Sequence, residues 1–262
     1  MLKLIASDLD GTLLLHGAQK LNPGIYDLIL ELKKHGIIFV AASGRQIASL
    51  RHLFAPIADQ ISYIAENGSI CLHDNKVISI SSTNREEVLR VLNTIKERPG
   101  CTPIVSCVSS IYTLAEYEDF IDHMENVLHN KVTTVAKFED IEEPFIKFAF
   151  RDLENNIQSA KHFKELFSDK FQVVTSGNGW VDLQTYDTNK GNALRKLLAE
   201  LDIKPEECIS FGDQQNDVEM LTLTGKSYAM AEAVPEAKAA ADEIINSVED
   251  TLRKILRELE QK

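Results

Sequence analysis

The chain has 262 residues, 44% of them hydrophobic, and carries a net charge of −12 from 28 Lys plus Arg against 40 Asp plus Glu. This length allows one large core or two modest ones, and the negative charge argues against binding to nucleic acid or to an anionic membrane surface. No run approaches the ~20 apolar residues that span a bilayer, and residues 1–7 do not form a signal sequence, so we expect a cytoplasmic protein.

Three apolar runs predict buried strands. They cover residues 2–7, 37–42 and 208–211, and each is nearly continuous rather than alternating. Continuous apolar strands are typical of a parallel sheet that is covered on both faces.

Amphipathic helices lie between these strands. After the first strand, Asn22 can cap a helix that starts with Pro23 and ends before Gly36. A second apolar stripe at residues 193–201 precedes the third strand. Strand, helix and strand at this spacing predict βαβ crossovers.

The middle of the chain has a different pattern. Thr83 and Glu86 suit a capping box for a helix that runs to about Arg98. Paired strands are predicted in residues 102–116 and 172–185, and helices in 116–130 and 154–167. We therefore expect a separate α+β module.

The cysteines are predicted to be small core residues of a reducing compartment. They form no C-x-x-C pair and have no histidine at metal-ligand spacing, so we expect no disulfide framework. The positions are Cys71, Cys101, Cys107 and Cys208.

Each of the three apolar strands ends in polar residues that can handle phosphate or metal. The first is followed by Asp8-Leu9-Asp10-Gly11-Thr12, the second by Ser43-Gly44-Arg45, and the third by the segment 212–217. Ligands bind at the carboxyl ends of the strands in open parallel sheets. The three termini are therefore expected to form one site.

The acidic residues of these segments need a counter-charge. Two carboxylates ~4 Å apart repel by ~4 kcal/mol at an effective dielectric of ~20, and Asp8, Asp10 and Asp213 would form several such pairs. A divalent cation removes the repulsion, and an all-oxygen donor set favours Mg²⁺, with Mn²⁺ tolerated. A metallated cluster can seat a phosphate oxygen while one carboxylate attacks phosphorus.

Two further segments can neutralise a phosphoryl group. Ser43 and Gly44 lie where a strand gives way to a helix, so a hydroxyl and backbone N–H groups can bind an anion there. Lys190 lies in the first turn of a predicted helix, where the helix dipole disfavours a cation. A bound phosphoryl group would explain its position.

Each motif also has a plain structural interpretation. Asp-x-Asp-Gly and the segment 212–217 could be polar turns, Ser43-Gly44-Arg45 a helix cap, and Lys190 a solvated lysine. The four motifs occur in this order and at strand ends or helix starts. One shared site explains this arrangement far better than four coincidences do.

The four motifs resemble those of the haloacid dehalogenase-like (HAD) superfamily, in its Cof-type sugar-phosphatase-like branch. They are "DLDGTLL" (8–14), "ASGR" (42–45), "NKG" (189–191) and "GDQQNDVEML" (212–221). The resemblance implies an α/β fold in which a Rossmann-like parallel-sheet core is interrupted by an inserted α+β cap domain. The core would comprise residues 1–82 and 186–262, and the cap residues 83–185.

The resemblance also implies residue roles. Asp8 would be the nucleophile that forms an aspartyl-phosphate, and Asp10 the acid and base. The Mg²⁺ ligands would be the Asp8 carboxylate, the Asp10 backbone carbonyl and Asp213, with Asp217 in support. The residues that would bind the phosphoryl group or the substrate are Ser43, Gly44, Arg45, Asn67, Lys190 and Asn216.

Some positions have less definite roles. Arg45 could orient an acidic neighbour or the substrate, and Glu66 and Asn67 in "AENGS" are candidates for substrate specificity. Where the branch often has Met-Gly-Asn-Ala, this chain has Met230-Ala-Glu-Ala, with Glu232 replacing the asparagine.

We expect a Mg²⁺-dependent phosphatase of small phosphomonoesters such as sugar phosphates. The alternatives are a phosphomutase or phosphotransferase, and a non-catalytic regulator that binds a phosphorylated metabolite. The sequence leaves the physiological substrate and the oligomeric state open.

Overall fold

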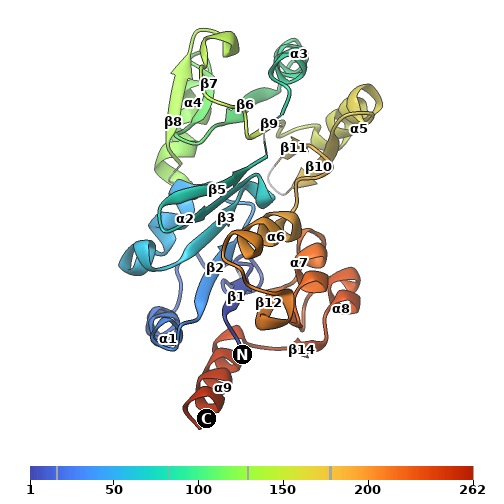
Figure 1. Cartoon of the computed structure of the whole chain (residues 1–262). Helices are drawn as coiled ribbons and strands as arrows, with labels where there is room; N and C mark the ends of the chain where they lie inside the picture. The colour runs from blue at the N-terminus through green and yellow to red at the C-terminus, as the bar shows by residue number, and fades with distance from the viewer. Residues whose placement is uncertain (16, 82, 129, 177–178, 262) are drawn as a thin grey trace. The chain divides into compact units, whose positions relative to one another are not determined.

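The computed structural model describes residues 1–15, 17–81, 83–128, 130–176 and 179–261. The chain divides into two compact units, one comprising Met1–Ile80 and Asn189–Lys262, the other Ser81–Thr188 (Figure 1). Residue 82, where we predicted the first core segment to end, lies outside the described residues.

The described part of the first unit is built on an eight-stranded sheet. Its order is β14-β13-β12-β1-β2-β3-β4-β5, parallel from β14 to β3 and antiparallel from β3 to β5. The strands are β1 (Leu4–Ser7), β2 (Ile38–Ala42), β3 (Ser62–Ala65), β4 (Ile70–His73), β5 (Lys76–Ile80), β12 (Cys208–Gly212), β13 (Lys226–Met230) and β14 (Glu243–Ile245).

The three predicted strands are confirmed as parallel neighbours. β1 lies between β2 and β12, and Ser7, its last residue, is opposite Ala41 and Phe211. The carboxyl ends of these strands therefore meet at one edge of the sheet. The sequence did not indicate the other five strands. One of them, β14, has 3 residues, and two of these, Glu243 and Ile244, are exposed.

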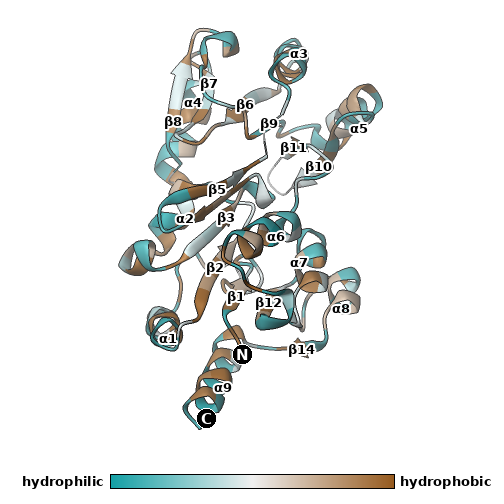
Figure 2. Ribbon diagram, viewed as in Figure 1, coloured by the Kyte–Doolittle hydropathy of each residue, from teal (hydrophilic) through white to brown (hydrophobic). Residues whose placement is uncertain are grey.

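Helices pack on both faces of this sheet (Figure 1). On one face, α6 buries its leucines against β1 and β2, and on the other α1 packs on β2 and α9. Figure 2 shows the apolar β1 and β2 between helices with hydrophilic outer surfaces. The helices are α1 (Pro23–Lys34), α2 (Ile47–Leu53), α6 (Lys190–Glu200), α7 (Val218–Leu223), α8 (Pro235–Ala240) and α9 (Val248–Glu260), with short 3₁₀ turns at Ala55–Gln60, Glu66–Gly68, Pro205–Glu207 and Gln215–Asp217.

The predicted start of α1 is confirmed. The Asn22 side chain accepts a hydrogen bond from the Gly24 N–H, and Pro23 is the first helical residue. Gly36 follows the helix with φ of +76°, a left-handed conformation that glycine adopts without a steric penalty.

The second unit contains a separate sheet of order β10-β11-β9-β6-β7-β8, antiparallel except between β7 and β8. The predicted strand pairs are confirmed, although residues 177 and 178 of one turn lie outside the described residues; β8 and β9 were not predicted. The strands are β6 (Thr102–Ser106), β7 (Ile111–Leu114), β8 (Val132–Val135), β9 (Lys147–Arg151), β10 (Gln172–Ser176) and β11 (Trp180–Gln184).

The helices of this unit pack on its sheet through an aromatic-rich core, which includes Phe148, Phe150, Phe163 and Phe171. The predicted helices are confirmed with shorter bounds. They are α3 (Arg85–Lys96), α4 (Glu118–Asp122), which continues as a π-helical turn at His123–Val127, and α5 (Asn156–Phe167); a 3₁₀ turn lies at Phe138–Asp140.

The predicted cap of α3 is wrong. Asn84, not Thr83, caps the helix, and its side chain accepts from the Glu87 N–H at 3.2 Å. The Thr83 hydroxyl instead donates to the Phe145 carbonyl at 3.2 Å. A tertiary contact thus removes the capping group that the local sequence favoured.

The four cysteines are free and buried, as expected. Burial raises the pKa of Cys71, Cys107 and Cys208 to about 12. In the described ranges of the chain, no helix has both the length and the apolarity needed to cross a membrane.

We predict that Gly191→Ala destabilises the first unit. Alanine favours a helix by up to about 1 kcal/mol over glycine, but a Cβ here would lie 2.6 Å from the Glu219 carbonyl carbon of α7. Overpacking of this kind costs about 1–3 kcal/mol, so after the helix gain the expected net loss is up to about 2 kcal/mol in urea unfolding.

Gly24→Ala is the matched control, because Gly24 is also the second residue of its helix. Its added Cβ would lie 3.4 Å from the Glu249 side chain, an ordinary contact. This variant should be as stable as the parent or slightly more stable. Equal behaviour of the two variants would contradict the steric argument.

Candidate active site

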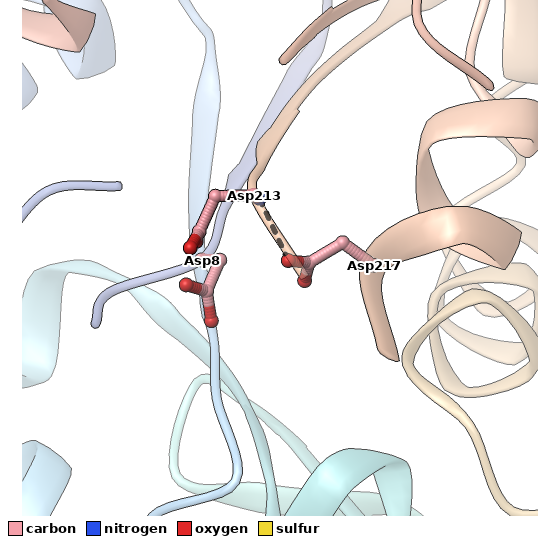
Figure 3. Close-up of side chains that lie close together, drawn as sticks. All are labelled: Asp8, Asp213 and Asp217. Atoms are coloured by element: carbon pink, nitrogen blue, oxygen red, sulfur yellow. Dashed lines mark hydrogen bonds between the residues drawn. The ribbon is translucent and has the colours of Figure 1, made fainter. Parts of the chain in front are cut away.

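Parallel pairing brings two aspartates together at the carboxyl edge of the sheet. Asp8 directly follows β1 and Asp213 directly follows β12, and the Asp8 N–H donates to the Phe211 carbonyl at 3.0 Å. With Asp217 they form a buried cluster in which one oxygen of each carboxylate lies within 4.8 Å of the others (Figure 3). The structure therefore brings together three of the predicted metal-binding residues.

The Asp213 carboxylate is fixed through both of its oxygens. The Thr12 hydroxyl donates to Oδ1 at 2.7 Å, and the Gln214 amide donates to Oδ2 at 2.8 Å. Gly11 turns the preceding loop with φ of +93°, and a Cβ at this position would lie 2.2 Å from Asp213 Oδ2. Thr12 and Gln214 lie within the motifs, but no pattern in the sequence indicated that their side chains orient Asp213.

Both oxygens of the Asp217 carboxylate accept hydrogen bonds. Its Oδ2 accepts from the backbone N–H groups of Asp213 and Gln214, both at 2.9 Å, and its Oδ1 accepts from Lys190 at 2.7 Å. The dashed line in Figure 3 marks the bond to Asp213. Asp217 thus holds the loop after β12 and the lysine in place.

Lys190 is fully buried at the start of α6. Its Nζ lies 2.5 Å from Asp8 Oδ1 and 2.7 Å from Asp217 Oδ1. Asn189 caps the same helix by accepting from the Asn192 N–H at 2.7 Å. Burial and the helix dipole both disfavour an ammonium here, but the two carboxylates outweigh them and raise the pKa of Lys190.

The Asp8 carboxyl is under opposing influences. Burial raises its pKa well above the usual range, and the carboxylates of Asp217 and Asp213 add to this, while the charge and hydrogen bond of Lys190 act in the other direction. The net effect is a raised pKa. The surrounding protein therefore disfavours the ionised form of Asp8 when Lys190 is its only cationic neighbour.

The loop between β2 and α2 carries the second motif. Ser43 is buried, and its hydroxyl oxygen accepts from the Arg45 N–H at 3.2 Å. Gly44 lies so close to Asn67 that an added Cβ would be 2.9 Å from Asn67 Oδ1. This oxygen also accepts from the Asn216 amide at 2.9 Å. Asn67 thus links two predicted phosphate-binding segments.

Asp10 lies apart from the buried acidic cluster. Its side chain is 56% exposed and pairs with Arg45, whose Nε and Nη2 donate to the two carboxylate oxygens at 2.8 and 2.5 Å. The structure therefore brings Asp10 and Arg45 together. The Asp10 carboxylate is not a member of the cluster formed by Asp8, Asp213 and Asp217.

The two remaining candidates differ in exposure. Glu66 is buried in a left-handed turn with φ of +50°. Glu232 is exposed in the turn after β13. Two residues later, the Val234 N–H donates to the Asp213 carbonyl at 2.9 Å, so the Glu232 turn is tied to the acidic cluster through the backbone.

Comparison with known proteins identifies the family. The sequence profile of the haloacid dehalogenase-like hydrolases matches residues 5–252. The chain belongs to this family. Within it, the four motifs place the chain in the Cof-type branch, and the fold is that of HAD hydrolases.

Two relatives are named for the same substrate. A 5-amino-6-(5-phospho-D-ribitylamino)uracil phosphatase of Escherichia coli K12 is 32% identical over 243 residues, which cover 92% of this chain and 89% of the relative. A Bacillus subtilis phosphatase named for this substrate is 24% identical and covers 98% of this chain and 95% of its own. A crystal structure from Eubacterium rectale superposes with a TM-score of 0.86 at 27% identity and covers 97% and 99% of the two chains. This HAD-family protein is a phosphatase.

We predict that Asp8→Asn stabilises the metal-free phosphatase at neutral pH. A carboxyl whose pKa is raised by folding destabilises the fold above its ordinary pKa of about 3.9, and the cost grows until the pH exceeds the raised pKa. The gain should therefore be present near pH 7 and shrink on acidification. Urea midpoints in EDTA across this range measure it.

The exposed Asp27 of α1 supplies the control. Asp27→Asn should not reproduce the gain, because this carboxylate is solvated. A loss of stability in Asp8→Asn at pH 7 would show that the Lys190 ion pair outweighs the burial of Asp8.

We also predict that Lys190→Met strongly destabilises the metal-free protein. The change leaves the buried carboxylates of Asp8 and Asp217 without their shared cation, and breaking a buried ion pair in this way costs about 3–5 kcal/mol. Urea unfolding in EDTA at pH 7 measures the loss. Lys226→Met removes an exposed ion pair with Glu243 and a cation–π contact with Tyr228, both near solvent, and should change the midpoint far less.

Proposed function

We propose that this protein is a Mg²⁺-dependent phosphatase that hydrolyses small phosphomonoesters through an aspartyl-phosphate on Asp8. The observation that carries the proposal is the Asp8 carboxylate itself. It is buried at the carboxyl edge of the sheet, next to Asp213, and is bonded through one oxygen to a buried lysine. A carboxylate in this position can act as a nucleophile beside a group that neutralises a phosphoryl oxygen.

The donor set supports Mg²⁺. The clustered ligand atoms are all carboxylate oxygens, which a hard cation prefers, and burial beside like charges disfavours ionised Asp8. We assign the ion to Asp8, Asp213 and the Asp10 backbone carbonyl. Asp217 would support them indirectly, since it accepts three hydrogen bonds, one of them from the buried cation of Lys190. When bound, the ion would supply positive charge to a phosphoryl oxygen.

In the first step, an Asp8 oxygen attacks phosphorus while the bond from phosphorus to the leaving oxygen breaks. Asp10 gives a proton to that oxygen, so the alcohol leaves neutral. In the second step, Asp10 takes a proton from water as the water oxygen attacks phosphorus. The acyl-phosphate bond breaks, and Asp8 and inorganic phosphate are released.

The phosphoryl oxygens would be held by groups of two loops and of the first turn of α6. Lys190 neutralises charge, and the Ser43 hydroxyl and the Gly44 N–H donate from the loop after β2. Asn216 donates from the loop after β12, with Asn67 bonded to its amide. A preorganised set of donors of this kind stabilises the charge that develops in phosphoryl transfer.

For the substrate we propose 5-amino-6-(5-phospho-D-ribitylamino)uracil or a closely similar phosphorylated polyol. Two relatives that span nearly the whole chain are named for this activity. We assign the choice of leaving group to the second unit, Ser81–Thr188, as an inserted cap. The four free thiols favour a reducing compartment, and we place the enzyme in the cytoplasm.

The test is phosphate release from this compound, from a panel of sugar phosphates and from p-nitrophenyl phosphate. We expect turnover with Mg²⁺, none with EDTA, and none for Asp8→Asn, because the nucleophile is removed. Asp27→Asn should keep full activity. Turnover by purified Asp8→Asn would sink the proposal, and an isomerised product without free phosphate would indicate a mutase.

A further inference from the structure

The Asp10 carboxylate is held by an unusually complete contact for a solvent-accessible group. Arg45 approaches it side-on, and two N–H groups of one guanidinium meet two oxygens of one carboxylate, at 2.8 and 2.5 Å. A single-point ion pair would leave the carboxylate free to rotate. The two-point contact fixes both the position and the plane of the carboxylate.

The backbone of Arg45 is itself fixed on both sides. Its N–H donates to the Ser43 hydroxyl oxygen at 3.2 Å, and its carbonyl accepts from the Glu66 N–H at 3.0 Å. Glu66 and Asn67 adopt left-handed conformations, with φ of +50° and +57°, which are costly for residues other than glycine. Strained backbone therefore supports the loop that presents Arg45.

Asp10 is anchored less firmly than the other aspartates of the motifs. It follows the end of β1 by three residues, and its side chain is 56% exposed, whereas Asp8, Asp213 and Asp217 are buried. Apart from Arg45, no described side chain donates to its carboxylate. Without this partner, the carboxylate would sample several staggered rotamers.

We propose that Arg45 is a positioning residue that acts through Asp10 rather than a direct ligand of the phosphoryl group. The inference rests on the proposed function, in which Asp10 transfers protons. The guanidinium uses one lone pair of each Asp10 oxygen and leaves others for proton transfer. The Nε–H and one Nη2–H are engaged with Asp10, so the geometry favours orientation of the acid over contact with substrate.

The inference predicts a dependence on the leaving group. In single-turnover experiments, Arg45→Ala should slow release of an alcohol from a sugar phosphate by about 10- to 100-fold, the usual effect of a misplaced catalytic group. Release of p-nitrophenolate, which departs without a proton, should change by less than about threefold. Arg45→Lys keeps the charge but lacks the two-point contact, and should behave like Arg45→Ala.

A double-mutant cycle tests whether Arg45 acts through Asp10. Asp10→Asn should slow alcohol release by about 10²- to 10⁴-fold, and adding Arg45→Ala should then change the rate by less than about twofold. Arg51→Ala is the matched control. Arg51 lies on α2 and bonds to Asp59 and Asn75, and its loss should leave the rates unchanged. Thermal unfolding of each variant excludes misfolding as the cause.

The outcomes separate this inference from the proposed function. Equal slowing of both leaving groups, a raised KM and full additivity with Asp10→Asn would show that Arg45 binds the phosphoryl group and would overturn the inference alone. Unchanged rates in Arg45→Ala, or recovery in Arg45→Lys, would overturn it as well. An inactive wild-type enzyme, or an active Asp8→Asn, would overturn the proposed function and this inference with it.

Discussion

The site depends on one pairing, that of β1 with β12, because it places Asp8 and Asp213 side by side at the same sheet edge. Like charges this close repel by several kcal/mol unless they are compensated. In the folded chain the compensation comes from Lys190, from two backbone N–H groups and from the donors of Thr12 and Gln214. These contacts hold the acids together without neutralising all of them, which leaves a demand for a further cation.

The cationic part of that compensation depends on where α6 begins. Gly191 packs against the backbone of Glu219, and Gly68, with φ of +99°, lies against the Asn189 carbonyl, where a Cβ would approach to 2.2 Å. These close approaches seat the first turn of α6 between α7 and the turn after β3. Lys190 is therefore placed by backbone packing rather than by its own flexible side chain.

The sequence predicted the features that follow from local pattern. Continuous apolar runs revealed β1, β2 and β12, and their polar ends indicated the residues that cluster at the sheet edge. It missed β9 and β13, whose pairing is set by distant strands, and it assigned the α3 cap to Thr83, whose hydroxyl is engaged by Phe145. The contact between Arg45 and Asp10 depends on side-chain rotamers across 35 residues, which no spacing rule encodes.

Four aspartates of the same motifs differ in how many hydrogen bonds each accepts, and this difference supports their separate roles. Asp217 accepts three hydrogen bonds, two at Oδ2 and one at Oδ1, and the bond at Oδ1 comes from the buried cation of Lys190, which suits it to support its neighbours. Asp213 accepts one bond at each oxygen and keeps lone pairs for a cation. Asp8 accepts a side-chain bond at Oδ1 alone in the described part of the chain, which leaves Oδ2 for the attack that we propose. Asp10 is exposed and held by Arg45, which suits the acid and base role that we propose for it. Neighbouring donors, rather than residue type, therefore set what each carboxylate can do.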